Sequence, residues 1–461
     1  MATIRFENRM SDMDALMWGI EKDPLLRSTI TALAVLDRAP DHERMREKIQ
    51  RGLAQIPRLR QRAVSTPGSI APPRWVTDAN FDLDYHVRFV RAAGDGTLRD
   101  LLDMAEPIAM QGFDRARPLW EFVVIEGLAD GKAALIQKIN HAVTDGVGGV
   151  QLALMLLDSE RDPAPTDEPL PDLDPPEDLS VWELLRDGIS HEQRRQLGIA
   201  KRSVERTLAT LRDPAGRARH LGALASSVGR LTAPAFTPLS PIMKDRSLSV
   251  RFDTTRAPLA EMKAAARTAG GRLNDAFVAA VAGGLARYHR RHGAETDALR
   301  MSMPINIRVA GGDTVAGNQF VPARFPIPLT IDDPIERMAA LRQLVGEQRE
   351  EPALAITEPI AGVLNRLPLS MTTALFGSLL KGIDIVTSNV PGVPFPVYLC
   401  GAAVEANFAF GPMAGAAANI TLLSYVDEVH VGINTDPAAV PDPEVFVECI
   451  DEGFAEVLKV G

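Results

Sequence analysis

The chain has 461 residues, of which 46% are hydrophobic and 24% are charged, a composition typical of a globular protein with sizeable cores. This length predicts two to four domains. With 50 basic and 60 acidic side chains the net charge is −10, which argues against a nucleic-acid partner because such a partner selects a basic face.

The cysteine content and the N-terminus indicate the compartment. Only Cys400 and Cys449 occur, which excludes a disulfide scaffold and a cysteine-based metal site and fits a reducing cell interior. The first 18 residues carry early charges and no apolar segment, unlike a secretory signal. Residues 406–426 are uncharged and long enough to span a membrane, but their glycines, proline and asparagines indicate buried strands and a turn. We expect a cytoplasmic protein, peripheral to a membrane or lipid droplet at most.

The first 140 residues predict alternating strands and helices. Residues 25–37 are rich in strand formers, and 41–54 predict a helix because apolar residues recur at intervals of four after Asp41, which suits an N-cap. Two apolar runs, 119–128 and 133–139, flank the turn signal Ala-Asp-Gly-Lys and predict a hairpin. Residues 56–64 predict a turn that leads into a strand, further strands are expected at 74–78 and 85–92, and a further helix is expected at 97–110.

The middle of the chain changes in composition. Residues 147–160 predict a buried helix, whereas 161–180 hold six prolines and seven acidic residues and predict a linker. Residues 181–212 predict a basic helix that includes the apolar residues Trp182 and Ile189. Two interpretations stay open for it: packing on the body with a solvated basic face, or contact with a membrane surface or lipid droplet.

A second α/β pattern begins near residue 246. It predicts strands at 247–253, 299–307 and 317–329, helices at 257–268, 273–291 and 333–349, further helices between 358 and 381, strands from 383 to 435, and a last helix from Pro443. We therefore predict an α/β protein with an N-terminal domain at 1–160, a linker and basic helical connector at 161–245, and a C-terminal domain at 246–461.

The segment His-Ala-Val-Thr-Asp-Gly at 141–146 follows the second hairpin strand and suits acyl transfer. An alcohol that attacks a thioester must lose its proton, and a histidine with a pKa near 6.5 can take it and later return it to the leaving thiolate. Asp145 can hold the loop by pairing with a basic side chain, and Gly146 lets the chain turn into the next helix. The alternative is an ordinary histidine at the end of a strand.

Eight blocks, in order, resemble the bacterial wax ester synthase/diacylglycerol acyltransferase family and extend over nearly the whole chain. They lie at 10–18, 117–128, 140–146, 273–288, 303–308, 317–320, 388–392 and 419–425, and include MSDMDALMW, RPLWEFVVIEGL, NHAVTDG, MPINIR and SNVPG. Any one could arise by chance, whereas eight in sequence order could not.

The resemblance implies two chloramphenicol acetyltransferase-like domains with mixed sheets and an active-site tunnel at their interface. It implies a fatty acyl-CoA co-substrate, a long-chain alcohol or diacylglycerol acceptor, no metal and no other cofactor. The family's second active-site histidine, the general base, corresponds to His141. Its first histidine is replaced by Asn140, which can hydrogen-bond but cannot titrate near pH 7.

The resemblance also indicates roles for other residues. It favours Arg60 as the partner of Asp145, with Arg58 as the competitor, because a buried aspartate requires a cation. Asn274 and Asp275 either serve the substrate site or cap their helix. The remaining candidates for the substrate site are Asn306, Arg308, Ser388 and Asn389, which a strand end and a Pro-Gly turn would equally explain.

Three functions stay open at this point. The first is synthesis of wax esters or triacylglycerol from acyl-CoA. The second is acyl transfer by the same fold to a different acceptor. The third is lipid binding by a family member whose activity is reduced because Asn140 replaces the histidine.

Overall fold

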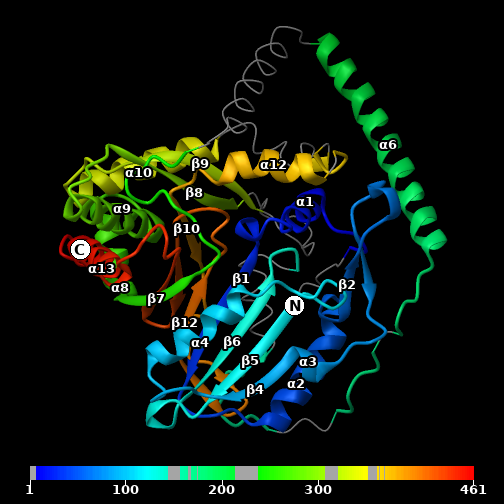
Figure 1. The fold of residues 1–461 in the computed structure, drawn as a ribbon, viewed down its shortest axis with the longest axis horizontal. Helices are drawn as coiled ribbons and strands as arrows, with labels where there is room; N and C mark the ends of the chain where they lie inside the picture. Colours follow the sequence, from blue (N-terminus) through cyan, green and yellow to red (C-terminus); the bar gives the residue numbers. More distant parts are fainter. Residues whose placement is uncertain are drawn as a thin grey trace.

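Two six-stranded sheets form the frame of the protein (Figure 1). The computed structural model describes residues 7–143, 156–164, 168–173, 175–212, 237–306, 320–350, 361–362, 364–367 and 369–461. The first sheet has the order β11 (Tyr398–Leu399), β12 (Ala402–Phe410), β1 (Thr29–Leu36), β6 (Ala133–Asn140), β5 (Trp120–Glu126) and β4 (Val87–Arg91). The second has the order β7 (Arg251–Pro258), β14 (Glu428–Thr435), β13 (Ala418–Tyr425), β10 (Ile385–Val390), β8 (Ala298–Asn306) and β9 (Phe320–Pro328). A small pair, β2 (Gln61–Val64) and β3 (Arg74–Thr77), lies beside them.

Both sheets are mixed, as predicted. In the first sheet β4 and β5 run parallel and the remaining neighbours run antiparallel. In the second sheet β10 runs parallel to both β13 and β8, and the outer pairs are antiparallel. The α/β class with mixed sheets is therefore confirmed.

Helices cover the sheets through apolar faces. Against the first sheet pack α2 (His42–Gln55) on one face and α4 (Leu98–Met110) on the other. The second sheet packs with α8 (Leu259–Thr268), α9 (Leu273–Arg291), α10 (Pro334–Arg349) and α13 (Pro443–Leu458) in one core. The remaining named helices are α1 (Asp12–Ile20), α3 (Leu83–His86), α6 (Val181–Arg212) and α12 (Leu369–Leu380), with 3-10 turns η1 (Pro24–Leu26), η2 (Pro57–Arg60), η3 (Pro67–Ser69) and η4 (Ala129–Gly131).

Local sequence signals place several elements correctly. The Asp41 side chain caps α2 by accepting from the Arg44 N–H at 2.9 Å, and β5 and β6 form the predicted hairpin. The strand expected at 85–92 begins only at Val87, because Asp82 caps a helical turn over Leu83–His86. The helix expected from residue 257 begins at Leu259, since pairing with β14 keeps Pro258 in β7. Most of the helix expected at 147–160 lies outside the described residues.

The two sheets do not divide the chain at a single point. Strands β11 and β12 come from the C-terminal half, yet β12 pairs along β1 in the first sheet, with Ala32 opposite Ala409. The next strand, β13, belongs to the second sheet. The boundaries at 160 and 246 stay a prediction, and the strand order adds that residues 398–410 complete the first sheet.

The segment at 406–426 consists of the end of β12, a turn and β13, as expected. Within the described ranges, no helix is long and apolar enough to cross a membrane.

Candidate active site

His141 lies in the turn directly after β6, at the centre of the first sheet. Strand β6 is held by β1 on one side and β5 on the other, so its end is fixed by two ladders. The His141 backbone N–H donates to the Ser28 carbonyl at 2.9 Å. The residue is only 8% exposed.

The neighbouring Asn140 holds this turn with both ends of its side chain. Its Oδ1 accepts from the Ala142 N–H at 2.9 Å, and its Nδ2 donates to Glu21 Oε1 at 2.7 Å. The same carboxylate oxygen accepts from the Ser28 N–H at 3.0 Å and from the Ser28 hydroxyl. The Ser28 carbonyl also accepts from the His141 N–H. Glu21 therefore links the residue before β1 to the end of β6, where the turn begins.

A cavity of about 260 Å³, here called the reaction chamber, lies between the two sheets and has His141 in its wall. The first sheet contributes residues of β1, β6 and β12, and the second contributes residues of β8, β9, β10 and β13. Met13, Met17 and Ile20 of α1 and Leu380 of α12 add apolar surface. An apolar cavity with few polar groups is the usual form of a lipid or cofactor site. The chamber thus lies where the tunnel was expected, and its continuity through the molecule stays a prediction.

Strand periodicity explains why β6 presents the histidine to the chamber. Alternate residues of a strand point to opposite faces, and Gln137, Ile139 and His141 line the chamber. On the opposite face Lys138 is fully buried, with its ammonium 3.3 Å from Glu121 and 4.5 Å from the centre of the Phe113 ring. Burial lowers the pKa of Lys138, and the charge of Glu121 opposes this shift. Lys138 therefore belongs to the core behind the site.

The structure brings some of the predicted substrate-site residues together. Ser388 lines the reaction chamber. Asn389 Nδ2 lies 3.5 Å from Asn274 Oδ1, and Asn274 Nδ2 lies 3.9 Å from the Met303 sulfur, which joins α9, β8 and β10. The Asp275 side chain accepts from the Arg272 N–H at 2.7 Å, which supports the capping interpretation for that residue.

Other predicted positions lie wholly or partly outside the described residues. Asn306 ends β8, but its side chain is not described, and neither are Arg308, Asp145 and Gly146. The pairing of Asp145 with Arg60 therefore stays a prediction.

The two arginines considered as partners of Asp145, Arg58 and Arg60, differ in burial and in their neighbours. Arg58 is 5% exposed, lies 4.1 Å from the centre of the Trp75 ring and donates to the Glu7 carbonyl at 2.9 Å. Burial lowers the pKa of Arg58 to about 9, and the charges of Asp14 and Glu7 oppose the shift. Arg60 is less buried and lines a small cavity with Pro57 and Thr77.

Sequence reasoning missed Glu21 and Ser28. Glu21 contacts Asn140 and Ser28 contacts the His141 N–H, each across more than a hundred residues, and one sequence holds no local signal for such contacts. The chamber residues Gln137 and Ile139 could have been found, because they follow from His141 by the two-residue period of a strand. In the described portion of the chain, no group of three or more His, Cys, Asp or Glu side chains is placed to hold a metal ion.

Two mixed sheets around an apolar chamber, with a histidine in the turn after β6, suit an acyltransferase, and sequence comparison gives the family. Residues 10–277 match the model of the wax ester synthase/diacylglycerol acyltransferase catalytic domain, and residues 316–458 match the model of the C-terminal domain of the same family. The chain belongs to this family and is an acyltransferase.

Relatives in Mycobacterium tuberculosis support the assignment. One protein named as a diacylglycerol O-acyltransferase is 38% identical, over 99% of this chain and 93% of its own length. A second of the same name is 30% identical, over 94% of this chain and 93% of its own length. Both alignments extend over almost the whole of each chain.

Solved structures share the fold. The wax ester synthase/diacylglycerol acyltransferase of Marinobacter aquaeolei VT8 superposes with a TM-score of 0.62 at 22% identity, over 97% of this chain and 98% of that one. The first condensation domain of the CDA synthetase gives a TM-score of 0.57 at 16% identity, over 99% and 97%. A starter condensation domain of rhizomide synthetase, solved in complex with C8-CoA, gives 0.57 at 12% identity, over 97% and 94%. The predicted relation to condensation-domain folds is therefore confirmed.

Proposed function

We propose that the protein transfers a fatty acyl group from acyl-CoA to the hydroxyl of a long-chain alcohol or a diacylglycerol, with His141 as the general base. The observation that carries this proposal is the position of His141 in the wall of an apolar chamber between the two sheets. Relatives are named as diacylglycerol O-acyltransferases, and a structural neighbour is titled as a complex with C8-CoA. Both names agree with a thioester donor and a lipid acceptor.

The chemistry needs one base and two substrates. The His141 imidazole takes the hydroxyl proton as the alcohol oxygen attacks the thioester carbon. The tetrahedral intermediate then collapses, the carbon–sulfur bond breaks, and the imidazolium returns the proton to the leaving CoA thiolate. The ester and free CoA are the products, and no acyl-enzyme forms. Neither Cys400 nor Cys449 lines the chamber, so neither thiol is placed to form an acyl-enzyme there.

Asp145, Gly146 and Arg60 are proposed to shape the catalytic turn. Asn274, Asn306, Arg308, Ser388 and Asn389 are proposed to line the path of the substrates. The paired amides of Asn274 and Asn389 and the chamber position of Ser388 support that assignment.

A thiol-release assay separates the three functions that the sequence leaves open. Palmitoyl-CoA is offered with hexadecanol, with a diacylglycerol, with short alcohols and without acceptor. Release that depends on hexadecanol or diacylglycerol supports the proposal, and release only with short alcohols indicates a different acceptor. Binding of acyl-CoA without release under all conditions identifies the protein as a lipid-binding member.

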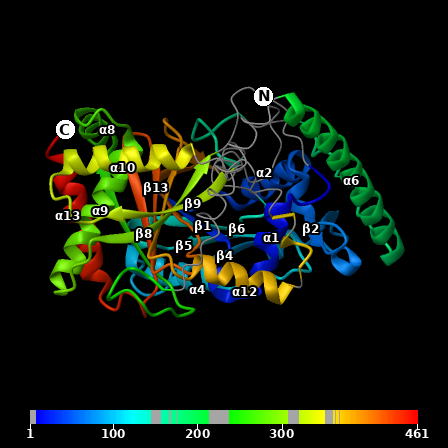
Figure 2. The same ribbon diagram turned by 90° about the horizontal axis from the view of Figure 1, so that it is seen from above.

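We further propose that α6 lies against an anionic lipid surface, at the cytoplasmic membrane face or on a lipid droplet. Figures 1 and 2 show α6 as a long helix along one edge of the molecule. Four apolar side chains point outward, with exposed fractions of 65% for Val181, 78% for Trp182, 42% for Ile189 and 71% for Leu197. Leu184 of the same helix is buried, with an exposed fraction of 7%, so α6 packs on the body through one side and leaves these apolar side chains uncovered on the other, which supports the surface interpretation.

The inner side of α6 is held by ion pairs, which leaves the outer side available. Asp187 pairs with Arg9 at 2.6 Å, Arg195 with Asp12 at 2.8 Å, and Glu192 with Arg366 at 2.8 Å. Sedimentation with anionic vesicles tests the contact. The triple variant Trp182→Ser, Ile189→Ser, Leu197→Ser should show a smaller fraction of protein bound to the vesicles. Equal binding by wild type and this variant would contradict the proposed membrane contact.

A further inference from the structure

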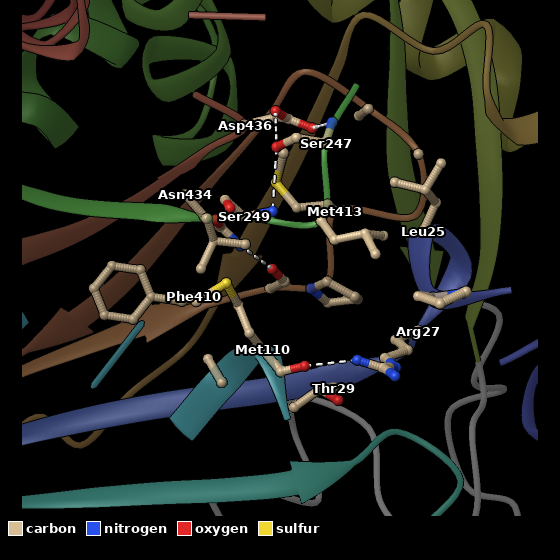
Figure 3. A pocket seen from close by; sticks show the side chains of 18 of the residues that line it. Leu25, Arg27, Thr29, Met110, Ser247, Ser249, Phe410, Met413, Asn434 and Asp436 are labelled. Carbon is tan, nitrogen blue, oxygen red and sulfur yellow. Dashed lines mark hydrogen bonds between the residues drawn. The ribbon is translucent and has the colours of Figure 1, made fainter. Parts of the chain in front are cut away.

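The reaction chamber runs along β1, away from the turn that carries His141. Ile30 and Ala32 of β1 line the chamber, whereas the alternate residues Thr29 and Thr31 line a smaller cavity of about 90 Å³ on the other face of the strand (Figure 3). Along one face of a strand, successive side chains are about 6.8 Å apart. The wall of the chamber therefore consists of rows of side chains, each of which crosses the paired strands.

One of these rows lies well away from the histidine. Ala32 stands opposite Gln137 of β6 on one side and opposite Ala409 of β12 on the other, and all three line the chamber. Gln137 precedes His141 by four residues, which corresponds to about 14 Å of extended chain. The chamber is therefore long enough to hold a substrate chain that extends from the base to this row.

The next row continues the wall on one side. Ala34 stands opposite Leu135 of β6 and opposite Asn407 of β12. Ala34 and Leu135 belong to the hydrophobic core, whereas Asn407 lines the chamber. Gln137 and Asn407 thus lie on the two strands that flank β1, near the same end of the chamber.

Gln137 and Asn407 each present a side-chain amide to this end of the chamber. Both residues are half-buried, and neither side chain forms a hydrogen bond with any residue that the structure describes. Asn419 of the second sheet also lines the chamber, but its amide donates to the Pro412 carbonyl at 2.9 Å and accepts from the Thr421 hydroxyl at 2.8 Å. Gln137 and Asn407 therefore keep their donors and acceptors available to a ligand.

These two amides disfavour a plain hydrocarbon chain at this end of the chamber. A chain that fills the chamber displaces water from both amides, and a buried amide without a partner costs free energy. A chain with a hydroxyl or carbonyl oxygen at this position restores a hydrogen bond. Sites that bond a polar group of the substrate discriminate against the analogue that lacks this group.

We propose that the chamber selects a fatty chain that carries a hydroxyl or carbonyl oxygen about ten to twelve carbons from the reacting carbon, bonded by Gln137 and Asn407. The distance follows from the length of wall between His141 and Gln137. The amides of the pantetheine arm of CoA and the ester groups of a diacylglycerol lie closer to the reacting carbon, so an oxygen on the chain fits better. This inference rests on the proposed acyl transfer and names the class of chain that is transferred or accepted.

The test uses pairs of substrates that differ by one hydroxyl at this position. Ricinoleoyl-CoA and oleoyl-CoA are compared as donors to hexadecanol, and ricinoleyl alcohol and oleyl alcohol are compared as acceptors from palmitoyl-CoA. Wild type should show a kcat/KM about three- to tenfold higher for the hydroxylated member of a pair, the effect of one uncharged hydrogen bond. Mass spectrometry of the ester shows that the primary hydroxyl has reacted.

Two variants remove the amides and keep the bulk of the side chains. Gln137→Met and Asn407→Leu should each reduce the ratio of kcat/KM between the hydroxylated and the plain substrate. Gln111→Met is the matched control, because Gln111 is exposed and lines neither cavity. This control should keep the wild-type ratio.

The pattern of ratios identifies the chain. A ratio that falls for the two donors assigns the acyl chain, and a ratio that falls for the two acceptors assigns the alcohol chain. Equal kcat/KM for hydroxylated and plain substrates in wild type would overturn the proposal. It would also be overturned if Gln137→Met raised KM equally for oleoyl-CoA and ricinoleoyl-CoA, since the amide would then contact the CoA part.

A binding measurement keeps this inference separate from the proposed function. Titration calorimetry with ricinoleic and oleic acid, and with the two alcohols, involves no turnover because no thioester is present. Tighter binding of a hydroxylated ligand by wild type, lost in both variants, supports the inference even if the protein transfers no acyl group. Equal affinities for the hydroxylated and the plain ligands overturn it, whether or not the enzyme is active.

Discussion

At the scale of single residues, the imidazole of His141 is the group on which the proposed chemistry depends. We expect His141→Ala to lower kcat for ester formation by about 100-fold or more, the usual effect of removing a general base. The measurement is thiol release from palmitoyl-CoA with hexadecanol, with circular dichroism to show that the fold is retained. A variant that keeps more than about a tenth of wild-type kcat would show that another group takes the proton.

Asn140 has an architectural role in this structure, and that role predicts the effect of restoring the family's histidine. Asn140 is fully buried and uses its acceptor toward Ala142 and its donor toward Glu21. A neutral imidazole also offers one donor and one acceptor. We expect Asn140→His to leave kcat within a few-fold and to keep a single basic limb in the pH–rate profile.

The opposite result has a clear signature. It is either a rise in kcat of about tenfold, which corresponds to roughly 1.4 kcal/mol of barrier, or a shift of the basic limb along the pH axis. It would show that position 140 tunes the base and that Asn140 alters the chemistry usual in the family.

The hydrogen bond from Asn140 to Glu21 can be tested by exchanging the amide and the carboxylate between the two positions. Asn140→Asp alone should lower both stability and kcat, because it places two carboxylates in hydrogen-bond contact. Adding Glu21→Gln should restore part of both, since the new amide nitrogen can donate to Asp at 140 once the amide turns so that its oxygen, now a separate atom, accepts from Ser28. A double-mutant cycle over kcat and the unfolding free energy measures the coupling. Additive losses would mean that Glu21 does not position the turn through residue 140.

The residues of the site differ in how far they could be predicted. His141 could be found because a short motif follows an apolar strand, and Ser388 because of its resemblance block. Glu21 carries no local signal, because it acquires its role only when β1 and β6 pair and bring it beside Asn140. Positions more than a hundred residues apart meet there, and a single sequence does not indicate that they do.

At the scale of elements, Asp384 ties the end of the connector to the second sheet. Its fully buried carboxylate accepts backbone N–H groups from Leu239 at 3.1 Å, Ser240 at 2.9 Å and Arg300 at 2.7 Å. We expect Asp384→Asn to cost about 1–3 kcal/mol of unfolding free energy, because the amide nitrogen would face a backbone donor. Urea denaturation measures the change.

The control for this prediction is Asp245→Asn, an exposed aspartate on the same segment. Its replacement should change the unfolding free energy by less than about 0.5 kcal/mol. Equal effects of the two substitutions would show that the buried carboxylate does not anchor the segment.

Elements could be predicted where the signal is local and missed where it is not. The cap at Asp41, the hairpin turn and the apolar period of α9 are readable in a few residues. The membership of β12 in the first sheet is not, because its partner β1 lies more than 360 residues away in the chain. Pairing over that separation depends on the whole fold.

At the scale of the whole molecule, a histidine joins the two sheets. His430 of β14 accepts through Nδ1 from the Asn407 N–H of β12 at 3.2 Å, and its Nε2 lies 3.1 Å from Glu428. The ring is 1% exposed. Because a backbone N–H can only donate, Nδ1 must be unprotonated, and a second proton on the ring breaks this bond between the sheets.

Two further buried histidines are also held in the neutral form. His289 Nδ1 lies 2.8 Å from the Leu285 carbonyl, which leaves Nε2 to accept from the Ser240 hydroxyl at 2.8 Å. His86 is fully buried, with Nδ1 2.7 Å from the Trp120 carbonyl. Burial is the largest cause that lowers the pKa of His86, His289 and His430 below the ordinary value of 6.5.

The lowered pKa values of the three histidines determine whether the protein becomes more or less stable as the pH falls. Below about pH 6.5 these histidines bind protons in the unfolded chain but stay neutral in the folded protein. Their contribution to the free energy of unfolding is therefore present above about pH 6.5 and is lost as the pH falls below it. We expect the melting temperature to decrease between about pH 7.5 and about pH 5.5. His430→Gln, which can still accept from Asn407 and donate to Glu428, should show a smaller decrease over the same interval. The two proteins differ at no other titratable residue, so the difference between the two profiles reports on the histidine. Parallel profiles would show that protonation of His430 does not govern how firmly the two sheets are joined.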